Sequence, residues 1–234
     1  MKTQGTGRMA MNRLMRTVLG PSLLLIFIAA CTETKYVKFS EVDEANSIPH
    51  LRTVAVEIDR EYYRNYPDCV VVLPPHASQG AERFSKLVEA SLALRLTRKI
   101  SQVISGAERD LAARRMSVDL VSPVDQDALM DGLGCDAFVT MEVIGPGQSY
   151  LVVWSEVRIG IEVRMIRAGD RRLLWRARHI AGRSEGGLPV SPVSFVMDAF
   201  SSTRFSADQE IVDSVIDDAV RRIVASLPNA ITLQ

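Results

Sequence analysis

The chain has 234 residues, and its 28 basic side chains balance its 28 acidic ones. That balance lacks the strong positive field that nucleic-acid binding requires, so we expect no nucleic acid among its partners. Hydrophobic residues make up 47% of the chain, an ordinary share for a globular protein with one buried core.

The first thirty residues have the pattern of a secretory signal peptide. Four basic residues and no acid precede the apolar run 23–28, and the small pair Ala29-Ala30 follows it. Because spanning a bilayer takes about 20 apolar residues, this run is too short for a transmembrane helix. We expect residues 1–30 to be removed, whichever of Met1, Met9 or Met11 is the true start.

The stretch Ile28-Ala29-Ala30-Cys31 resembles the lipobox of bacterial lipoproteins. The resemblance implies that the Cys31 thiol is acylated, with palmitate among the acyl chains, and that Cys31 becomes the mature N-terminus. The second residue of the mature chain would be Thr32 and not aspartate. In typical lipoproteins this resembles the signal for sorting to the outer membrane and not for retention in the inner membrane, so we expect the protein on the periplasmic face of the outer membrane. A cleaved signal without lipid is the alternative, but it gives the cysteine no role.

After the signal, the sequence predicts a polar, flexible tether over residues 31–50 and one domain over residues 51–230. The apolar run Cys69–Leu73 ends at two prolines and is typical of a strand buried on both faces. Serines at 105 and 122 are predicted helix N-caps, and Gly132 or Gly134 ends the second of these helices. The expected elements are a strand at 51–58, a connection at 61–67, strands at 69–73 and 99–104, helices at 81–98, 107–115 and 123–132, and a strand at 136–143.

From Val157 to Met165, apolar and polar residues alternate, as in a half-buried strand. A turn at Ala168-Gly169-Asp170 returns the chain into an antiparallel partner at 173–179. Ser191-Pro192 starts a predicted helix that runs to about residue 204. Ser206 then caps the last helix, at about 207–227, whose apolar stripe runs from Ile211 to Leu227.

This order of elements resembles the fold of the TolB N-terminal domain and of bacterial envelope lipoproteins, including the curli-secretion lipoprotein and the outer-membrane activator of a peptidoglycan synthase. The resemblance is carried by Val70–Pro75, Leu133–Phe138 and Leu173–Trp175. It implies an α/β fold with a three-layer-like mixed sheet, in which an antiparallel hairpin extends a parallel βαβ core between flanking helices.

The same resemblance implies a non-enzymatic accessory or assembly component of an envelope protein complex. A subunit of an oligomeric secretion pore is the alternative, since hairpins from many subunits form a pore in the curli-secretion relatives. A homo-oligomer therefore remains open, beside envelope proteins and the membrane itself as partners.

Cys69 and Cys135 are left as an even pair in an oxidising compartment, which makes them a disulfide candidate. They precede the first and third parallel strands, which are neighbours in folds of the resembled type. The resemblance therefore implies a Cys69–Cys135 disulfide, and two buried free thiols are the alternative.

Residues 182–186 match the G-x-S-x-G pattern of serine hydrolases, with Ser184 as the nucleophile. No histidine follows Ser184, so a hydrolase is only a remote alternative.

The histidines are too widely spaced for a zinc site, and we expect no metal and no cofactor. The loop from His76 to Gly80 follows a parallel strand and is the candidate ligand loop, although an ordinary loop is the favoured interpretation.

The hairpin region 156–183 holds eight arginines and three acids, so one face is basic. Arg158, Arg164, Arg176 and Arg178 could dock an anionic or acidic surface, or they could form local ion pairs of little energy. The same alternation would suit a membrane hairpin, but we expect the C-terminal helix to cover its apolar stripe. Phe195 and Phe200 mark a second candidate surface, which could instead pack on the core.

Overall fold

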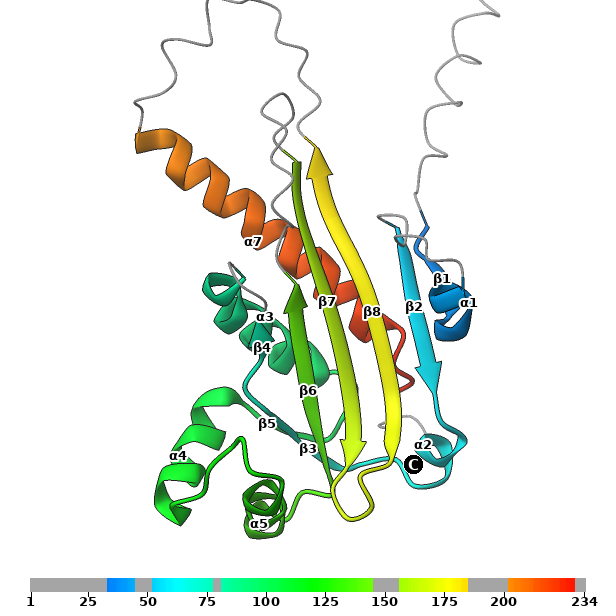
Figure 1. The fold of residues 1–234 in the computed structure, drawn as a ribbon, viewed down its shortest axis with the longest axis vertical. Helices are drawn as coiled ribbons and strands as arrows, with labels where there is room; N and C mark the ends of the chain where they lie inside the picture. Colours follow the sequence, from blue (N-terminus) through cyan, green and yellow to red (C-terminus); the bar gives the residue numbers. More distant parts are fainter. Residues whose placement is uncertain (1–32, 45–51, 78–80, 145–155, 185–201, 230–234) are drawn as a thin grey trace, which may run out of the picture. The chain divides into compact units, whose positions relative to one another are not determined.

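The structure, a computed structural model, describes residues 33–44, 52–77, 81–144, 156–184 and 202–229 (Figure 1). The chain separates into two units, Met1–Glu33 and Thr34–Gln234. Every helix and strand that the structure describes belongs to the second unit, and the predicted signal lies outside the described residues. None of the described helices has the length and apolarity to cross a bilayer.

The elements along the described chain are β1 (Lys35–Lys38), α1 (Phe39–Glu44), β2 (Thr53–Ile58), α2 (Arg60–Arg64), β3 (Cys69–Val72), β4 (His76–Ala77), α3 (Glu82–Leu96), β5 (Gln102–Ile104), α4 (Gly106–Met116), α5 (Pro123–Leu133), β6 (Ala137–Ile144), β7 (Glu156–Arg167), β8 (Leu173–Ser184) and α7 (Ser202–Ala225).

One mixed sheet of eight strands organises the domain, in the order β1-β2-β8-β7-β6-β3-β5, with β4 also paired to β6. β3 runs parallel to both β5 and β6, while β6, β7, β8 and β2 pair antiparallel. Helices flank the sheet (Figure 1). The predicted α/β fold, a parallel core extended by an antiparallel hairpin, is confirmed.

The larger core lies between the sheet and the helices α3 and α7. Alternation along β7 places Ile159, Ile161, Val163 and Met165 on this face, all fully buried. α7 covers them with a stripe of apolar side chains, and the indole of Trp175 on β8 donates to the hydroxyl of Ser226 at 3.2 Å. The C-terminal helix thus covers the apolar face of the hairpin, as predicted.

A smaller core lies on the opposite face of the sheet, under α5. Val71 and Phe138 point away from α7 and pack with Leu129 and Met130 of α5. α5 ends at Gly134, whose φ of 66° lies in the left-handed region that glycine adopts without strain. The glycine stop delivers the chain directly into β6.

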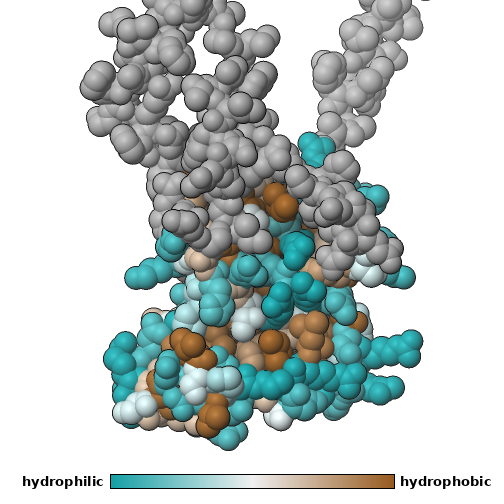
Figure 2. Space-filling model, in the orientation of Figure 1, coloured by the Kyte–Doolittle hydropathy of each residue, from teal (hydrophilic) through white to brown (hydrophobic). Residues whose placement is uncertain are grey.

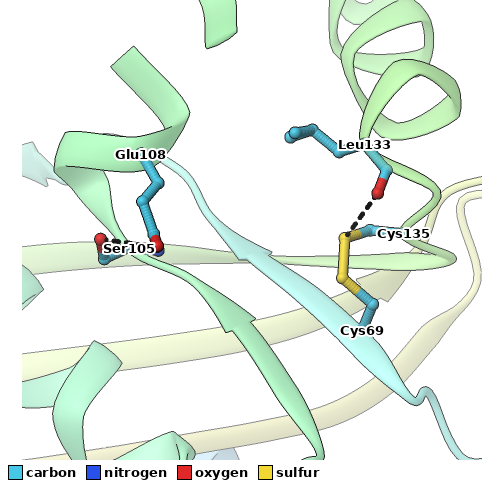
Figure 3. Close-up of a disulfide and its surroundings, with 5 residues drawn as sticks. All are labelled: Cys69, Ser105, Glu108, Leu133 and Cys135. Carbon is cyan, nitrogen blue, oxygen red and sulfur yellow. Dashed lines mark hydrogen bonds between the residues drawn. A yellow bond between two sulfur atoms is a disulfide. The ribbon is translucent and has the colours of Figure 1, made fainter. Parts of the chain in front are cut away.

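The predicted disulfide is present in this smaller core (Figure 3). Cys69 begins β3, and Cys135 lies two residues before β6, the neighbouring parallel strand. Their Cα atoms are 4.7 Å apart, and both residues are buried. Figure 3 also shows the start of α4, where the Glu108 carboxylate accepts from the backbone N–H and the hydroxyl of Ser105, both at 2.9 Å.

The structure differs from the predicted tether over residues 35–44. β1 pairs in parallel with β2, from Lys35 opposite Thr53 to Lys38 opposite Val56, and α1 places Phe39 against the sheet. The sequence of this segment has no apolar periodicity, because β1 is an edge strand with mostly exposed side chains. The described domain therefore begins well before residue 51.

Two other elements depart from the prediction, and a third lies mostly outside the described residues. Residues 60–64, expected as a connection, form α2, which is capped by the Asp59 side chain accepting from the Glu61 N–H at 2.7 Å. α7 begins at Ser202, so Ser206 lies inside the helix and does not cap it. Most of the helix predicted at 192–204 lies outside the described residues.

Replacing both cysteines, Cys69→Ala with Cys135→Ala, should lower the free energy of unfolding. The crosslink spans 66 residues of sequence, and closing a loop of that length removes about 4 kcal/mol of entropy from the unfolded chain. Urea unfolding of the two proteins measures the loss. Reductant should destabilise the wild type similarly and leave the double variant unchanged; equal stability of the two oxidised proteins would contradict the prediction.

Candidate interaction surface

The predicted basic face of the hairpin is built around one acidic residue. Glu162 on β7 lies directly opposite Arg178 on β8, and Arg164 lies opposite Arg176 in the same ladder. Because these positions alternate with the buried apolar ones, all four residues occupy the face away from α7. We call Arg164, Arg176 and Arg178 around Glu162 the arginine cluster. Figure 2 shows the molecule from this side, where hydrophilic residues lie among smaller hydrophobic patches.

All three arginines of the cluster donate to the Glu162 carboxylate. The Nε atoms of Arg164 and Arg176 lie 2.7 and 2.8 Å from Oε1, and Nε of Arg178 lies 2.8 Å from Oε2. Glu162 is only 2% exposed. Burial on its own would raise the pKa of this carboxyl, but the hydrogen bonds from Arg176, Arg178 and Arg164 outweigh burial and hold the pKa below its usual value.

The first helix covers part of the arginine cluster. The guanidinium of Arg176 lies 3.6 Å from the ring centroid of Phe39, and that of Arg178 lies 5.1 Å from it, so both cations contact the aromatic face. Their side chains are 22% and 29% exposed, against 44% for Arg164. Arg164 is therefore the most accessible cation of the cluster.

The arginines at the base of the hairpin also pair within the chain. Arg167 contacts Asp170 and Glu61, Arg171 contacts Asp127 on α5, and Arg172 contacts Asp59 at the start of α2. These contacts hold the β7–β8 turn against α2 and α5. Together with the cluster, all six hairpin arginines whose side chains the structure describes form ion pairs, which favours the local ion-pair interpretation of this face.

The remaining predicted site residues are only partly described by the structure. His76 is exposed in β4, opposite Glu142 of β6, so the predicted ligand loop begins as a short strand; Gly80 lies outside the described residues. Arg158 lies opposite Gly182, and only its backbone is described. Phe195 and Phe200 lie outside the described part of the chain, and within that part no three metal-ligating side chains converge.

Ser184 and His179 do not form a catalytic pair. Both lie on β8, five residues apart, which places their Cα atoms about 16 Å from each other along the strand. His179 is fully buried, with Nδ1 2.8 Å from the carbonyl oxygen of Thr53 and no hydrogen-bond partner for Nε2. This arrangement gives no support to a hydrolase centred on Ser184.

A second buried charge, Arg109 of α4, has no clear signal in the sequence. Its guanidinium is 3% exposed, donates to the carbonyl oxygen of Val72 at 2.5 Å and pairs with Glu89 of α3. Gly106 leaves room for the Glu89 side chain here, since a Cβ at position 106 would lie 2.5 Å from a carboxylate oxygen of Glu89. The glycine directly after the predicted Ser105 cap was the only sequence signal for this contact.

No protein-family model matches the chain, and no curated protein matches it. Among solved structures, lipoprotein GNA1162 from Neisseria meningitidis is 17% identical, with a TM-score of 0.45 over 63% of this chain and 99% of that one. A PelC dodecamer from Paraburkholderia phytofirmans is 13% identical, with a TM-score of 0.40 over 73% and 98%. The LpoB C-terminal domain from Salmonella enterica is 7% identical, with a TM-score of 0.35 over 49% and 82%. Lipoproteins thus stand among the solved structures to which the chain is similar.

Glu162→Gln should destabilise the domain by about 2 kcal/mol, because it removes the charge that balances three arginines. A fully buried ion pair costs about 3–5 kcal/mol when broken, and the partial exposure of these arginines reduces that value. Urea unfolding at pH 7 gives the measurement. The matched control is Glu57→Gln, an exposed carboxylate opposite Arg176 on β2, which should change stability by less than about 0.5 kcal/mol. Equal effects of the two substitutions would contradict the assigned role.

His179 should make the domain sensitive to mild acid. Burial lowers the pKa of its imidazole and outweighs the opposing hydrogen bond to Thr53, so the unfolded chain binds the proton more readily than the folded one. Stability should therefore hold above the unfolded pKa of about 6.5 and fall as the pH drops below it. Urea unfolding between pH 7 and pH 5 measures the slope, which His179→Gln should reduce; an unchanged slope would remove His179 as the cause.

Proposed function

We propose that this protein is a lipid-anchored component of the bacterial envelope, held by Cys31, which works through protein contacts and not by catalysis. The observation that carries the proposal is the buried disulfide between Cys69 and Cys135. Structural disulfides persist in oxidising compartments, and the periplasm is the compartment to which a lipobox protein is delivered. Two independent parts of the chain, the signal and the core, therefore favour the same location.

The arrangement of the polar groups supports an accessory role. The two most buried charges, Glu162 and Arg109, are each satisfied by partners within the domain, and His179 is separated from Ser184 along one strand. The accessible side of the arginine cluster, above all Arg164, is the candidate contact for an acidic partner protein in an envelope complex.

The alternative of a pore subunit receives less support from the described hairpin. The apolar faces of β7 and β8 are already covered by α7, with Trp175, Ile216 and Val220 fully buried in the shared core. Inserting this hairpin into a bilayer would first require removing α7 from it. A pore would therefore need another lipid-facing element.

The anchor is tested by Cys31→Ser in the natural host. We expect the wild type to incorporate labelled palmitate and to fractionate with the outer membrane, and the variant to lose the label and remain unprocessed by the lipoprotein pathway. The matched control is Thr32→Asp, which should keep the lipid and move the protein to the inner membrane. Unchanged labelling and fractionation of Cys31→Ser would refute the proposed function.

A further inference from the structure

The described domain begins very close to the predicted lipid. The side chain of Thr34 accepts a hydrogen bond from Arg222 of α7 at 2.7 Å, and the Lys35 N–H donates to the carbonyl oxygen of Arg52 at 3.0 Å. From Lys35 onward the chain is paired to β2. No slack is therefore available beyond Thr34 unless these contacts break.

Cys31 and Thr34 are only three residues apart, since 34 minus 31 is 3. A fully extended chain advances about 3.3–3.6 Å per residue, so about 11 Å is the farthest that Thr34 can lie from the Cα of Cys31. A domain of about 200 residues has a radius of gyration of about 16 Å, which exceeds this reach. A domain held so tightly at one point rests against the surface that holds it.

Exposed basic residues and a tyrosine lie on β1 and at Arg52, next to the acidic helix α1. Lys35, Lys38 and Arg52 are exposed, and no ion pair of theirs occurs within the described part of the chain. Tyr36 is 46% exposed while its hydroxyl lies 3.3 Å from the carbonyl oxygen of Arg222. Glu33 is the one acid between Cys31 and Lys38. Basic residues attract anionic headgroups, and tyrosine is enriched at headgroup level.

We propose that the edge strand β1, with Lys35, Tyr36, Lys38 and Arg52, rests on the membrane that carries the lipid anchor and binds anionic headgroups there. This inference rests on the proposed function, because it needs the lipid on Cys31. In this arrangement the domain has a fixed orientation on the membrane and does not move freely on a flexible tether. Figure 1 shows α4 and α5 at the opposite end of the domain from β1, so these helices face away from the membrane.

The test uses the full-length, lipidated protein reconstituted into vesicles of phosphatidylethanolamine with 20% phosphatidylglycerol, about the anionic content that gives a clear surface potential. A lipid carrying a photoactivated carbene precursor in its headgroup labels whatever touches it, and mass spectrometry locates the label. We expect label on residues 35–38 and on Arg52, and at least about fivefold less on α4.

Two changes should remove the contact. Lys35→Glu with Lys38→Glu should lower labelling of the β1 segment at least about fivefold, since it reverses the attraction. Inserting 20 Gly/Ser residues between Glu33 and Thr34 should also lower it, because such a linker has an end-to-end distance of about 25 Å. The matched control is Arg114→Glu with Arg115→Glu, the same charge change on exposed residues of α4, which should leave labelling unchanged.

The outcomes separate the two proposals. If mass spectrometry finds no lipid on Cys31, the proposed function fails and this inference fails with it. If Cys31 carries lipid but β1 is labelled no more than α4, or if Lys35→Glu with Lys38→Glu leaves the labelling unchanged, only the docking of β1 is overturned. A cooperative urea unfolding transition in every variant checks that each one has folded.

Discussion

The antiparallel pairing of β7 with β8 determines what both faces of the domain do. Its register places Ile161 and Val163 on one face, under α7, and Glu162 between arginines on the other. Side chains alternate with a period of two, so a slip of one residue in either strand would exchange the apolar and charged sets. The core and the arginine cluster are therefore two consequences of one register.

The turn that fixes this register is itself held by ion pairs. Arg171 adopts a φ of 56° and contacts α5 through Asp127, while Arg172 contacts Asp59, the residue that caps α2. Exposed ion pairs of this kind contribute little energy one at a time. Their value here is geometric, because each joins the turn to an element far away in sequence.

Much of this arrangement could be predicted from the sequence, and the failures have one physical cause. The alternation of β7 and the stripe on α7 are long and strongly periodic, so they identify their elements without tertiary information. The run Cys69–Leu73 is short, but its β-branched residues and the two prolines after it mark a buried strand. β1 and α1 are short and polar, and only pairing with β2 and the burial of Phe39 stabilises them. The disulfide could be predicted because the resemblance made β3 and β6 neighbours. The burial of Glu162 and Arg109 could not be predicted, because it depends on the register of β7 against β8 and on the packing of α4 against α3.

The addition of β1 to the sheet links the fold to the anchor. Without it, β2 would be the edge strand and would expose a row of unpaired backbone groups, which invites pairing with other chains. β1 covers that edge, and its two lysines make the new edge a poor template for further strands. Because Lys35–Lys38 are paired in the sheet, they cannot also serve as a linker between the domain and Cys31. Protection of the sheet edge and a short distance to the membrane therefore arise from a single element, so lengthening the tether by releasing β1 would expose the sheet.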